Sequence, residues 1–125
     1  MLERYVVVDL EMTGLNPRRD RILEIGAARV EHGEVTARYE TFVNPGGCIP
    51  EKVRELTGIT DEMVKDAPRI SEILPDFIVF CADDIFVGHN VIFDYSFLKQ
   101  AAINEKLSFE RQAVDTLKLA RKFLP

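Results

Sequence analysis

The sequence has few of the residues that build thiol or histidine sites. Among its 125 residues are two cysteines, Cys48 and Cys81, and two histidines, His32 and His89. The cysteines lie far apart and lack the spacing of metal ligands. The start of the chain shows no small-residue cleavage site of an export signal. We therefore expect free thiols in a reducing compartment, the cytoplasm.

Long apolar runs and low-complexity segments are missing as well. No run approaches the roughly 20 residues that span a bilayer, so we expect no membrane partner. There is no internal repeat. A composition of 46% apolar and 30% charged residues is ordinary for a globular chain. Because the length suits one hydrophobic core, we expect a single domain over residues 1–125.

Basic residues are fewer than acidic residues. The 16 Lys and Arg against 21 Asp and Glu give a formal net charge of −5 at pH 7. This balance argues against a nucleic-acid coat protein, because non-specific binding to phosphates depends on Lys and Arg. It does not exclude an enzyme acting on nucleic acid, since carboxylates can gather metal ions that supply the positive charge.

Apolar periodicity and turn residues predict alternating strands and helices. The predicted strands are 5–10, 22–30, 35–43, 84–88 and 113–115; the predicted helical segments are 51–58, 60–64, 69–81, 91–102 and 116–124. Pro75 predicts a kink, or a break into two pieces, in the third of these segments. The order implies a mixed α/β sheet, with an antiparallel hairpin at one edge and parallel strands joined by helices. A crevice is expected beyond the carboxyl ends of the parallel strands.

Two acids stand at the end of the first predicted strand. Asp9 and Glu11 are two residues apart, so on a strand both side chains point to the same face. A cation between them would relieve their repulsion, and carboxylate oxygens suit Mg²⁺ or Mn²⁺. The alternative is that Glu11 has already left the strand and caps the following turn.

Two further acids follow later strands. Asp94 lies one helical turn after Asn90, and the topology brings this helix face beside the end of the first strand. Three converging acids favour a metal site, whereas the alternative for Asp94 is a solvated acid stabilised by the helix dipole. For Asp115, in an Asp-Thr pair, we favour a helix N-cap over a ligand.

These residues stand in segments that resemble a known family. VVVDLEMTGL (6–15) and GHNVIFDYSFL (88–98) resemble the first and second motifs of the DEDD superfamily of 3′–5′ exonucleases. The segment 44–60 is similar to the linking segment of the proofreading branch, as in the epsilon subunit of bacterial DNA polymerase III. VDTLKLAR (114–121) is similar to the family's next strand and helix. The resemblance covers essentially the whole chain and implies a ribonuclease H-like fold, in agreement with the strand order.

The resemblance also implies roles for individual residues. Asp9, Glu11 and Asp94 would be the metal ligands and catalytic carboxylates; Met12, Thr13 and Gly14 would line the pocket of the terminal nucleotide, with a close backbone approach at Gly14; Leu56 would wedge against the last base; Asn90, Phe93 and Phe97 would lie near the substrate or support the helix. For the two phenylalanines, core packing is at least as good an explanation.

One family motif is missing. The third motif, a histidine followed five residues later by aspartate, has no free match, because the position five residues after His32 is Ala37 and the position five after His89 is Asp94. The sequence ends at Pro125, where the family continues, so we expect a domain that is incomplete at its C-terminus. Losing the histidine removes a proton-transfer contribution of roughly 10²–10⁴-fold. We therefore expect this chain alone to be weak or inactive.

The implied chemistry is hydrolysis of terminal phosphodiesters of single-stranded DNA with two Mg²⁺ or Mn²⁺ ions, one of them weakened. The implied partners are a DNA 3′ end or a nucleoside monophosphate, and a DNA polymerase. Two alternatives stay open. One is a non-catalytic module that binds metal, nucleotide or a partner, including a second copy through an uncovered sheet face. The other is an RNA-trimming enzyme, because the stretch from Asp9 to Gly14 is also similar to oligoribonuclease.

Overall fold

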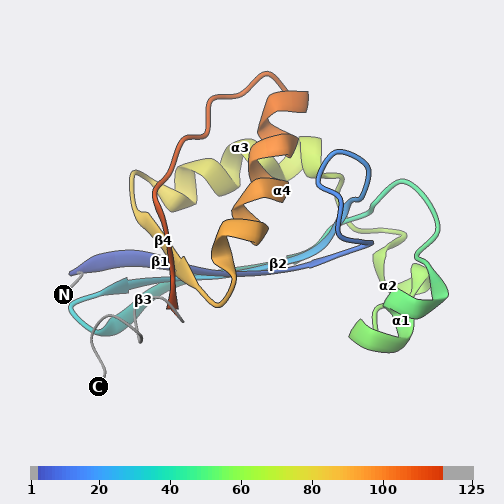
Figure 1. The fold of residues 1–125 in the computed structure, drawn as a ribbon, viewed down its shortest axis with the longest axis horizontal. Coiled ribbons are helices and arrows are strands. Elements are labelled where there is room, and N and C mark those ends of the chain that lie inside the picture. Colours follow the sequence, from blue (N-terminus) through green and yellow to red (C-terminus); the bar gives the residue numbers. More distant parts are fainter. Residues whose placement is uncertain (1–2, 117–125) are drawn as a thin grey trace.

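The computed structural model describes residues 3–116, which fold into a mixed sheet with two helices packed on one of its faces (Figure 1). The strands are β1 Arg4–Met12, β2 Ile22–Glu31, β3 Glu34–Phe42, β4 Ile85–Gly88 and β5 Ala113–Asp115. The helices are α1 Glu51–Thr57, α2 Asp61–Val64, α3 Ile70–Cys81 and α4 Val91–Asn104.

The strand order is β3-β2-β1-β4-β5, with β2 antiparallel to both of its neighbours, β1 and β3, and with β4 and β5 parallel to β1. The predicted mixed sheet with an antiparallel edge hairpin is therefore confirmed. The hairpin between β2 and β3 turns at His32 and Gly33, whose φ angles are 52° and 81°. Two positive φ values are what a two-residue turn needs to match the twist of its strands.

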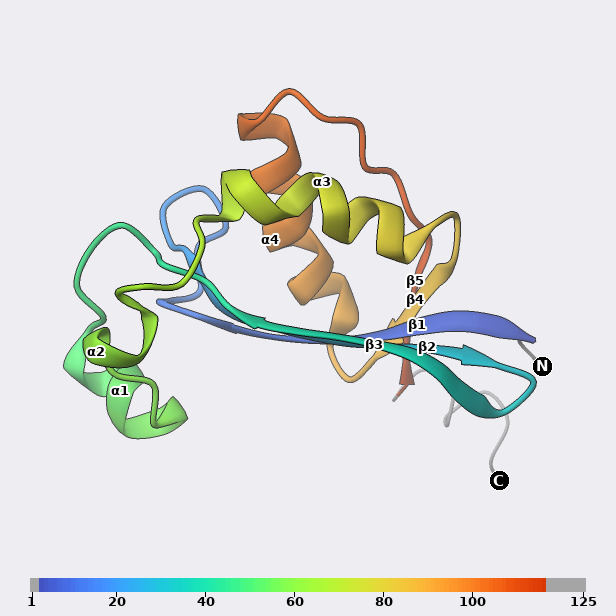
Figure 2. The same cartoon turned by 180° about the vertical axis from the view of Figure 1, so that it is seen from behind.

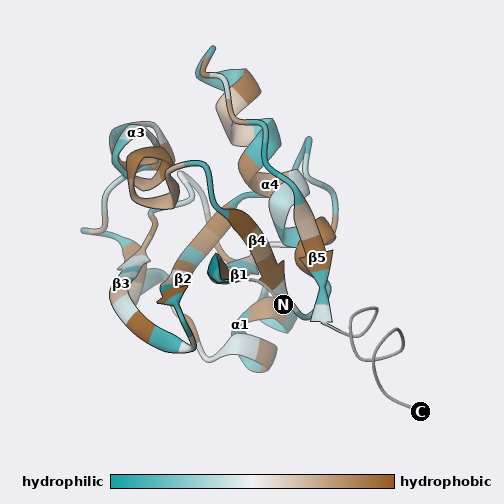
Figure 3. Ribbon diagram, turned by 90° about the vertical axis from the view of Figure 1, so that its left-hand side faces the viewer, coloured by the Kyte–Doolittle hydropathy of each residue, from teal (hydrophilic) through white to brown (hydrophobic). Residues whose placement is uncertain are grey.

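The core lies between the sheet and the helices α3 and α4. Val6, Val8 and Leu10 alternate along β1 and are buried, because every second residue of a strand faces the helices. Figures 1 and 2 show α3 and α4 above this face, and α1 and α2 at one end of the sheet on the other side. Figure 3 shows that β4 is apolar along its length, as expected of a central parallel strand.

The helix α3 runs unbroken through Pro75, so the predicted break into two pieces is wrong. A proline inside a helix removes one backbone hydrogen bond and crowds the preceding turn. Leu74 and Phe77, on either side of it, are fully buried. Burial of these two side chains offsets the lost bond and keeps both halves of the helix on the core.

Two expectations about ends and caps have different outcomes. The helical segment predicted at 60–64 is the short helix α2, which Thr60 caps, since its hydroxyl accepts a hydrogen bond from the Met63 N–H at 3.3 Å. The predicted helix 116–124 lies outside the described residues except for Thr116.

The two cysteines are free, as predicted: Cys48 is exposed and Cys81 is buried. Burial raises the pKa of the Cys81 thiol to about 12. None of the helices formed by residues 3–116 is both long and apolar enough to cross a membrane.

Candidate active site

Asp9 and Glu11 both belong to β1, where Glu11 pairs with Glu24 of β2 just before the register shifts at Met12. Glu11 has therefore not left the strand. The two acids lie on the sheet face opposite the buried valines, Asp9 exposed and Glu11 half-buried. The prediction that both carboxylates share one face is confirmed.

Asp94, in the first turn of α4, connects this helix to β1. The ladder between β1 and β4 ends at the pair Val7–Val87. Beyond it, the N–H of Leu10 donates a hydrogen bond of 3.2 Å to Asp94 Oδ2. Because Leu10 lies between Asp9 and Glu11 in the chain, this bond fixes the third acid beside the strand segment that carries the other two. Asp94 is only 7% exposed.

The pKa values of two of these acids, Asp94 and Glu11, are raised. Burial raises the pKa of Asp94 to about 6, the hydrogen bond from Leu10 opposes the shift, and the charges of Asp9 and Glu11 add to it. Burial also raises the pKa of Glu11, with further contributions from Asp9 and Glu24. Both shifts mean that the charged forms are disfavoured where they stand. A bound cation would remove this penalty.

The donor atoms fit a hard divalent ion, because they are carboxylate oxygens in a partly desolvated place. Within residues 3–116, however, no three acidic, histidine or cysteine side chains stand in an arrangement ready to hold a metal ion. The carboxylate oxygens suit Mg²⁺ or Mn²⁺ by their chemistry. Because they are not arranged as a finished metal site, the ligand set Asp9, Glu11 and Asp94 stays a prediction.

A cleft of about 420 Å³, lined by Glu11 but not by Asp9 or Asp94, lies where β1 ends. Its lining comes from β1, the following loop and α1: Leu10, Glu11, Met12, Gly14, Leu15, Lys52, Val53, Leu56 and Thr57. Residues predicted on two separate segments thus border one space: Glu11, Met12 and Gly14 from the segment 6–15, and Leu56 from the segment 44–60. The side chain of Leu56 is 81% exposed, which leaves an apolar surface free at the edge of the cleft.

Thr13 and Gly14 have structural partners that the sequence did not reveal. The Thr13 hydroxyl accepts a hydrogen bond of 2.9 Å from the Arg21 N–H, and the Thr13 N–H donates to the Arg21 carbonyl at 2.8 Å. A Cβ at Gly14 would lie 2.3 Å from an Asp20 carboxylate oxygen. The close approach at Gly14 is therefore to Asp20, and Thr13 closes the base of the loop to Arg21.

The remaining predicted residues lie on or before α4. Asn90 precedes the helix with a φ of 56°, is exposed, and makes no side-chain capping bond. Phe93 is half-buried and its ring lies 5.4 Å from that of Phe97, which is 2% exposed. Phe97 is thus a core residue that supports the helix, whereas the amide of Asn90 faces solvent.

Lys52 is a cleft residue that the sequence reasoning missed. It lies four residues before Leu56 on α1, and both line the cleft. A spacing of four residues on a helix places two side chains on one face, so the predicted role of Leu56 could have pointed to Lys52 as well. A lysine ammonium at the cleft edge is a donor suited to a phosphate oxygen.

Solved structures with the same arrangement of strands and helices identify the fold. Exonuclease I from E. coli, solved in complex with a dA13 oligonucleotide, superposes with a TM-score of 0.83 at 17% identity, covering 97% of this chain and 30% of that chain. Exonuclease X, solved with 5′-overhanging duplex DNA, gives a TM-score of 0.73 at 26% identity and covers 97% and 64%. The fold is the ribonuclease H-like fold of DEDD exonucleases, as predicted.

A family model described as exonuclease, of the RNase T type, matches residues 6–125. The chain belongs to this exonuclease family, whose members generally depend on divalent metal ions.

Curated relatives refine the likeness. The DNA polymerase III epsilon subunit of Aquifex aeolicus is 41% identical over 122 residues. The PolC-type DNA polymerase III of Oceanobacillus iheyensis is 41% identical over 126 residues. Both alignments include almost all of this chain, which spans 60% of the epsilon subunit and 9% of the PolC-type polymerase.

Proposed function

We propose that the chain is a 3′–5′ exonuclease module that removes terminal nucleotides from single-stranded DNA. The main observation that supports this function is the hydrogen bond from Leu10 to Asp94, which holds the acid of the second motif against the strand that bears Asp9 and Glu11. Membership of the exonuclease family and the cleft beside these acids support the same proposal.

The carboxylates and the apolar edge of the cleft have separate roles in this proposal. Asp9, Glu11 and Asp94 would hold two divalent ions, whose chemistry at this site would be activation of the attacking water and neutralisation of charge on the leaving 3′ oxygen. Met12 and the apolar edge of the cleft hold the terminal nucleotide. Leu56, exposed at that edge, packs against the last base.

Full activity needs a proton acceptor and a fourth carboxylate that this sequence does not supply as a third motif. We propose that hydrolysis by these 125 residues alone is slow, because general-base catalysis contributes roughly 10²–10⁴-fold. A replicative DNA polymerase is the proposed partner, since the curated relatives are an epsilon subunit and PolC-type polymerases of DNA polymerase III.

The proposal is tested with a 5′-labelled single-stranded DNA and a matched RNA, incubated with Mg²⁺ or Mn²⁺. The Aquifex aeolicus epsilon subunit serves as the reference for rate. We expect slow, metal-dependent shortening of the DNA from its 3′ end, releasing nucleoside monophosphates and lost in Asp9→Ala. The matched control is Asp83→Ala, an exposed acid away from the cleft, which should shorten DNA at the wild-type rate.

Other results would replace the proposal. Rates equal to those of the epsilon subunit would contradict the expected weakness of the chain. Faster shortening of RNA than of DNA would favour the oligoribonuclease-like alternative. Mn²⁺ binding with no hydrolysis of either strand would favour a non-catalytic module, and sedimentation would then show whether it pairs through the sheet face that bears Asp9 and Val7.

A further inference from the structure

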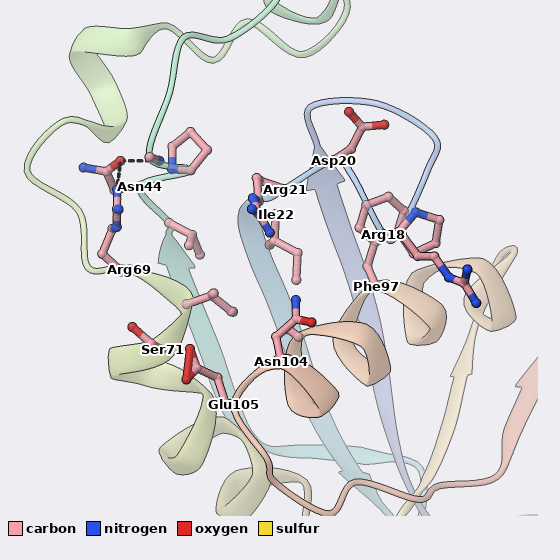
Figure 4. A pocket seen from close by; sticks show the side chains of 16 residues that line it. Arg18, Asp20, Arg21, Ile22, Asn44, Arg69, Ser71, Phe97, Asn104 and Glu105 are labelled. Carbon is pink, nitrogen blue, oxygen red and sulfur yellow. Dashed lines mark hydrogen bonds between the residues drawn. The ribbon is translucent and has the colours of Figure 1, made fainter.

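A second cavity bordered by residues 3–116 lies away from the carboxylate cleft. It has a volume of about 660 Å³ and shares no lining residue with the cleft. The loop 17–22, the turn at Asn44–Gly46, the start of α3 and the end of α4 surround it (Figure 4). A space of this volume accommodates a small molecule.

Two arginines without a carboxylate partner face this cavity. Arg21 points between the ends of α3 and α4, toward Asn104, and Arg69 lies across from it at the start of α3 (Figure 4). In the described part of the chain, neither guanidinium has a carboxylate oxygen within 4 Å, whereas Arg4, Arg29 and Arg54 each form such a pair. In a chain of net charge −5, two uncompensated guanidinium groups at one cavity indicate an anionic ligand.

Arg69 is held in place by the turn beside it. The Asn44 side chain is fixed at both ends, because its oxygen accepts from the Gly46 N–H at 2.8 Å and its amide donates to the Lys65 carbonyl at 3.0 Å. Arg69 then donates to the same oxygen at 3.5 Å. A Cβ at Gly46 would lie 2.7 Å from Arg69 Nη1, so the glycine leaves the space that the guanidinium occupies.

Arg21 is fixed through its backbone. The two hydrogen bonds with Thr13 close the loop and set the direction in which the Arg21 side chain leaves it. Arg18 also lines the cavity but points away from Arg21 in Figure 4. The positive end of the site is therefore built from Arg21 and Arg69.

The other polar groups of the cavity set its net charge. Ser71 and Asn104 supply neutral donors, and Ser71 belongs to the first turn of α3, where backbone N–H groups lack partners in the helix. Of the two acids, Asp20 already accepts from the Asn16 N–H at 2.9 Å and lies against Gly14. Glu105, at the end of α4, is the acid that opposes an anion here.

We propose that this cavity is a phosphate-binding site distinct from the carboxylate cleft. Planar guanidinium groups bind phosphate oxygens in pairs, and two arginines opposed by one acid leave positive charge for a phosphate group. The phosphate comes either from a free nucleoside monophosphate or from the backbone of a nucleic-acid strand. This site goes beyond the exonuclease proposal and does not depend on it.

The test is calorimetric titration of the 125-residue chain with inorganic phosphate, deoxyadenosine monophosphate and a short single-stranded oligodeoxynucleotide. EDTA is present throughout, so that no cation holds phosphate at the carboxylates, and the readout is binding instead of hydrolysis. Failure of the exonuclease proposal would therefore leave this measurement unaffected. Mononucleotide binding more tightly than inorganic phosphate identifies the free nucleotide as the source, and the oligonucleotide binding more tightly than the mononucleotide identifies the strand.

Four variants separate the site from general charge effects. Arg21→Gln and Arg69→Gln each weaken binding by about tenfold, which is the loss of one charge-assisted contact. Arg38→Gln makes the same charge change on the exposed part of β3, outside the cavity, and leaves binding unchanged. Glu105→Gln strengthens binding by about threefold, because it removes the opposing acid. Damage to the fold cannot produce such a gain.

The proposal is overturned by any of three results. One is wild-type chain that binds none of the three probes at about 10 mM, a concentration that detects even weak sites. Another is an equal loss of binding in Arg38→Gln and Arg21→Gln. The third is weaker binding in Glu105→Gln.

Discussion

Asp84 and Asp94 flank β4 and both have buried side chains, but the charged groups around them are of opposite sign. The Asp84 side chain, just before the strand, is 8% exposed and lies 2.7 Å from Arg4 Nε and 3.8 Å from Arg29 Nε. Asp94, after the strand, receives a single backbone N–H, and the charges nearest to it are those of two more carboxylates. One end of the sheet neutralises its buried acid, and the other end gathers negative charge.

The difference separates a part that holds the fold together from a part that serves a ligand. At the Asp84 end, Arg29 also donates to the Phe80 carbonyl and lies 4.8 Å above the Phe80 ring, so the acid ties β1, β2 and α3 together. At the Asp94 end, burial and the charges of Asp9 and Glu11 disfavour the ionised form of Asp94, so its negative charge opposes folding. Local violations of this kind are expected where a protein binds something.

The largest effect is expected from removing the neutralised acid. Asp84→Ala leaves the Arg29 guanidinium half-buried without its carboxylate and frees Arg4, so we expect a loss of about 3 kcal/mol in the free energy of unfolding. Urea denaturation at pH 7 measures it. The exposed neighbour provides the control, since Asp83→Ala should change stability by less than about 0.5 kcal/mol. Equal losses in both variants would remove the distinction between the two ends of β4.

Replacing Asp94 is expected to have the opposite effect, an increase in the free energy of unfolding. The folded-state pKa of Asp94 is raised to about 6 from an ordinary value of 3.8. The stabilising effect of its proton is therefore complete below about pH 3.8 and is lost as the pH rises through about 6. Asp94→Asn keeps an acceptor for the Leu10 N–H but never ionises. We expect it to stabilise the metal-free chain above pH 6 by up to about 3 kcal/mol.

Urea denaturation of wild type and Asp94→Asn at several pH values between about 4 and 8, in EDTA, follows this difference. The gain should shrink toward zero at the acidic end of the series. A gain that is constant across the series would show that ionisation is not its cause, and a loss of stability at pH 8 would contradict the surroundings described for Asp94.

A smaller effect is expected on metal binding. Asp94→Asn should weaken Mn²⁺ binding to the 125-residue chain by at least about tenfold, because even residues that only support a ligand change metal affinity by 10–100-fold. Asp84→Asn is the matched control, with the same chemical change at the neutralised acid, and should bind Mn²⁺ like wild type. Titration followed by electron paramagnetic resonance of free Mn²⁺ gives both constants. Equal affinity in the two variants would exclude Asp94 as a ligand.

The sequence predicts those features that depend on local pattern. Alternation along β1 placed Asp9 and Glu11 on one face, and the turn residues at His32 and Gly33 predicted the hairpin. These predictions succeed because side-chain direction in a strand has a fixed period of two. The mixed sheet with an antiparallel edge hairpin followed from the usual geometry of connections between strands and helices.

Features that depend on packing between distant segments could not be predicted from the sequence. The bond from Leu10 to Asp94 exists only because α4 packs on β1. Gly14 is forced by Asp20, six positions away across a loop, and the unbroken α3 depends on how Leu74 and Phe77 are buried. Arg21 and Arg69 meet at one cavity only after the sheet and α3 have formed. Each of these depends on three-dimensional contacts that no local spacing encodes.

The smallest effect on stability is expected at the edge of the cleft. Leu56 is 81% exposed, so Leu56→Ala buries and uncovers almost nothing and should change the free energy of unfolding by less than about 0.5 kcal/mol. Its loss should nevertheless weaken binding of single-stranded DNA several-fold, about what one stacking contact contributes. Fluorescence anisotropy of a labelled oligonucleotide, with Ca²⁺ in place of Mg²⁺, measures the affinity. Val79→Ala is the control, because Val79 is 77% exposed on α3 away from the cleft. If both substitutions left DNA binding unchanged, Leu56 would be an ordinary surface residue, and the Asp94 end of the sheet would lose its apolar contact with a base.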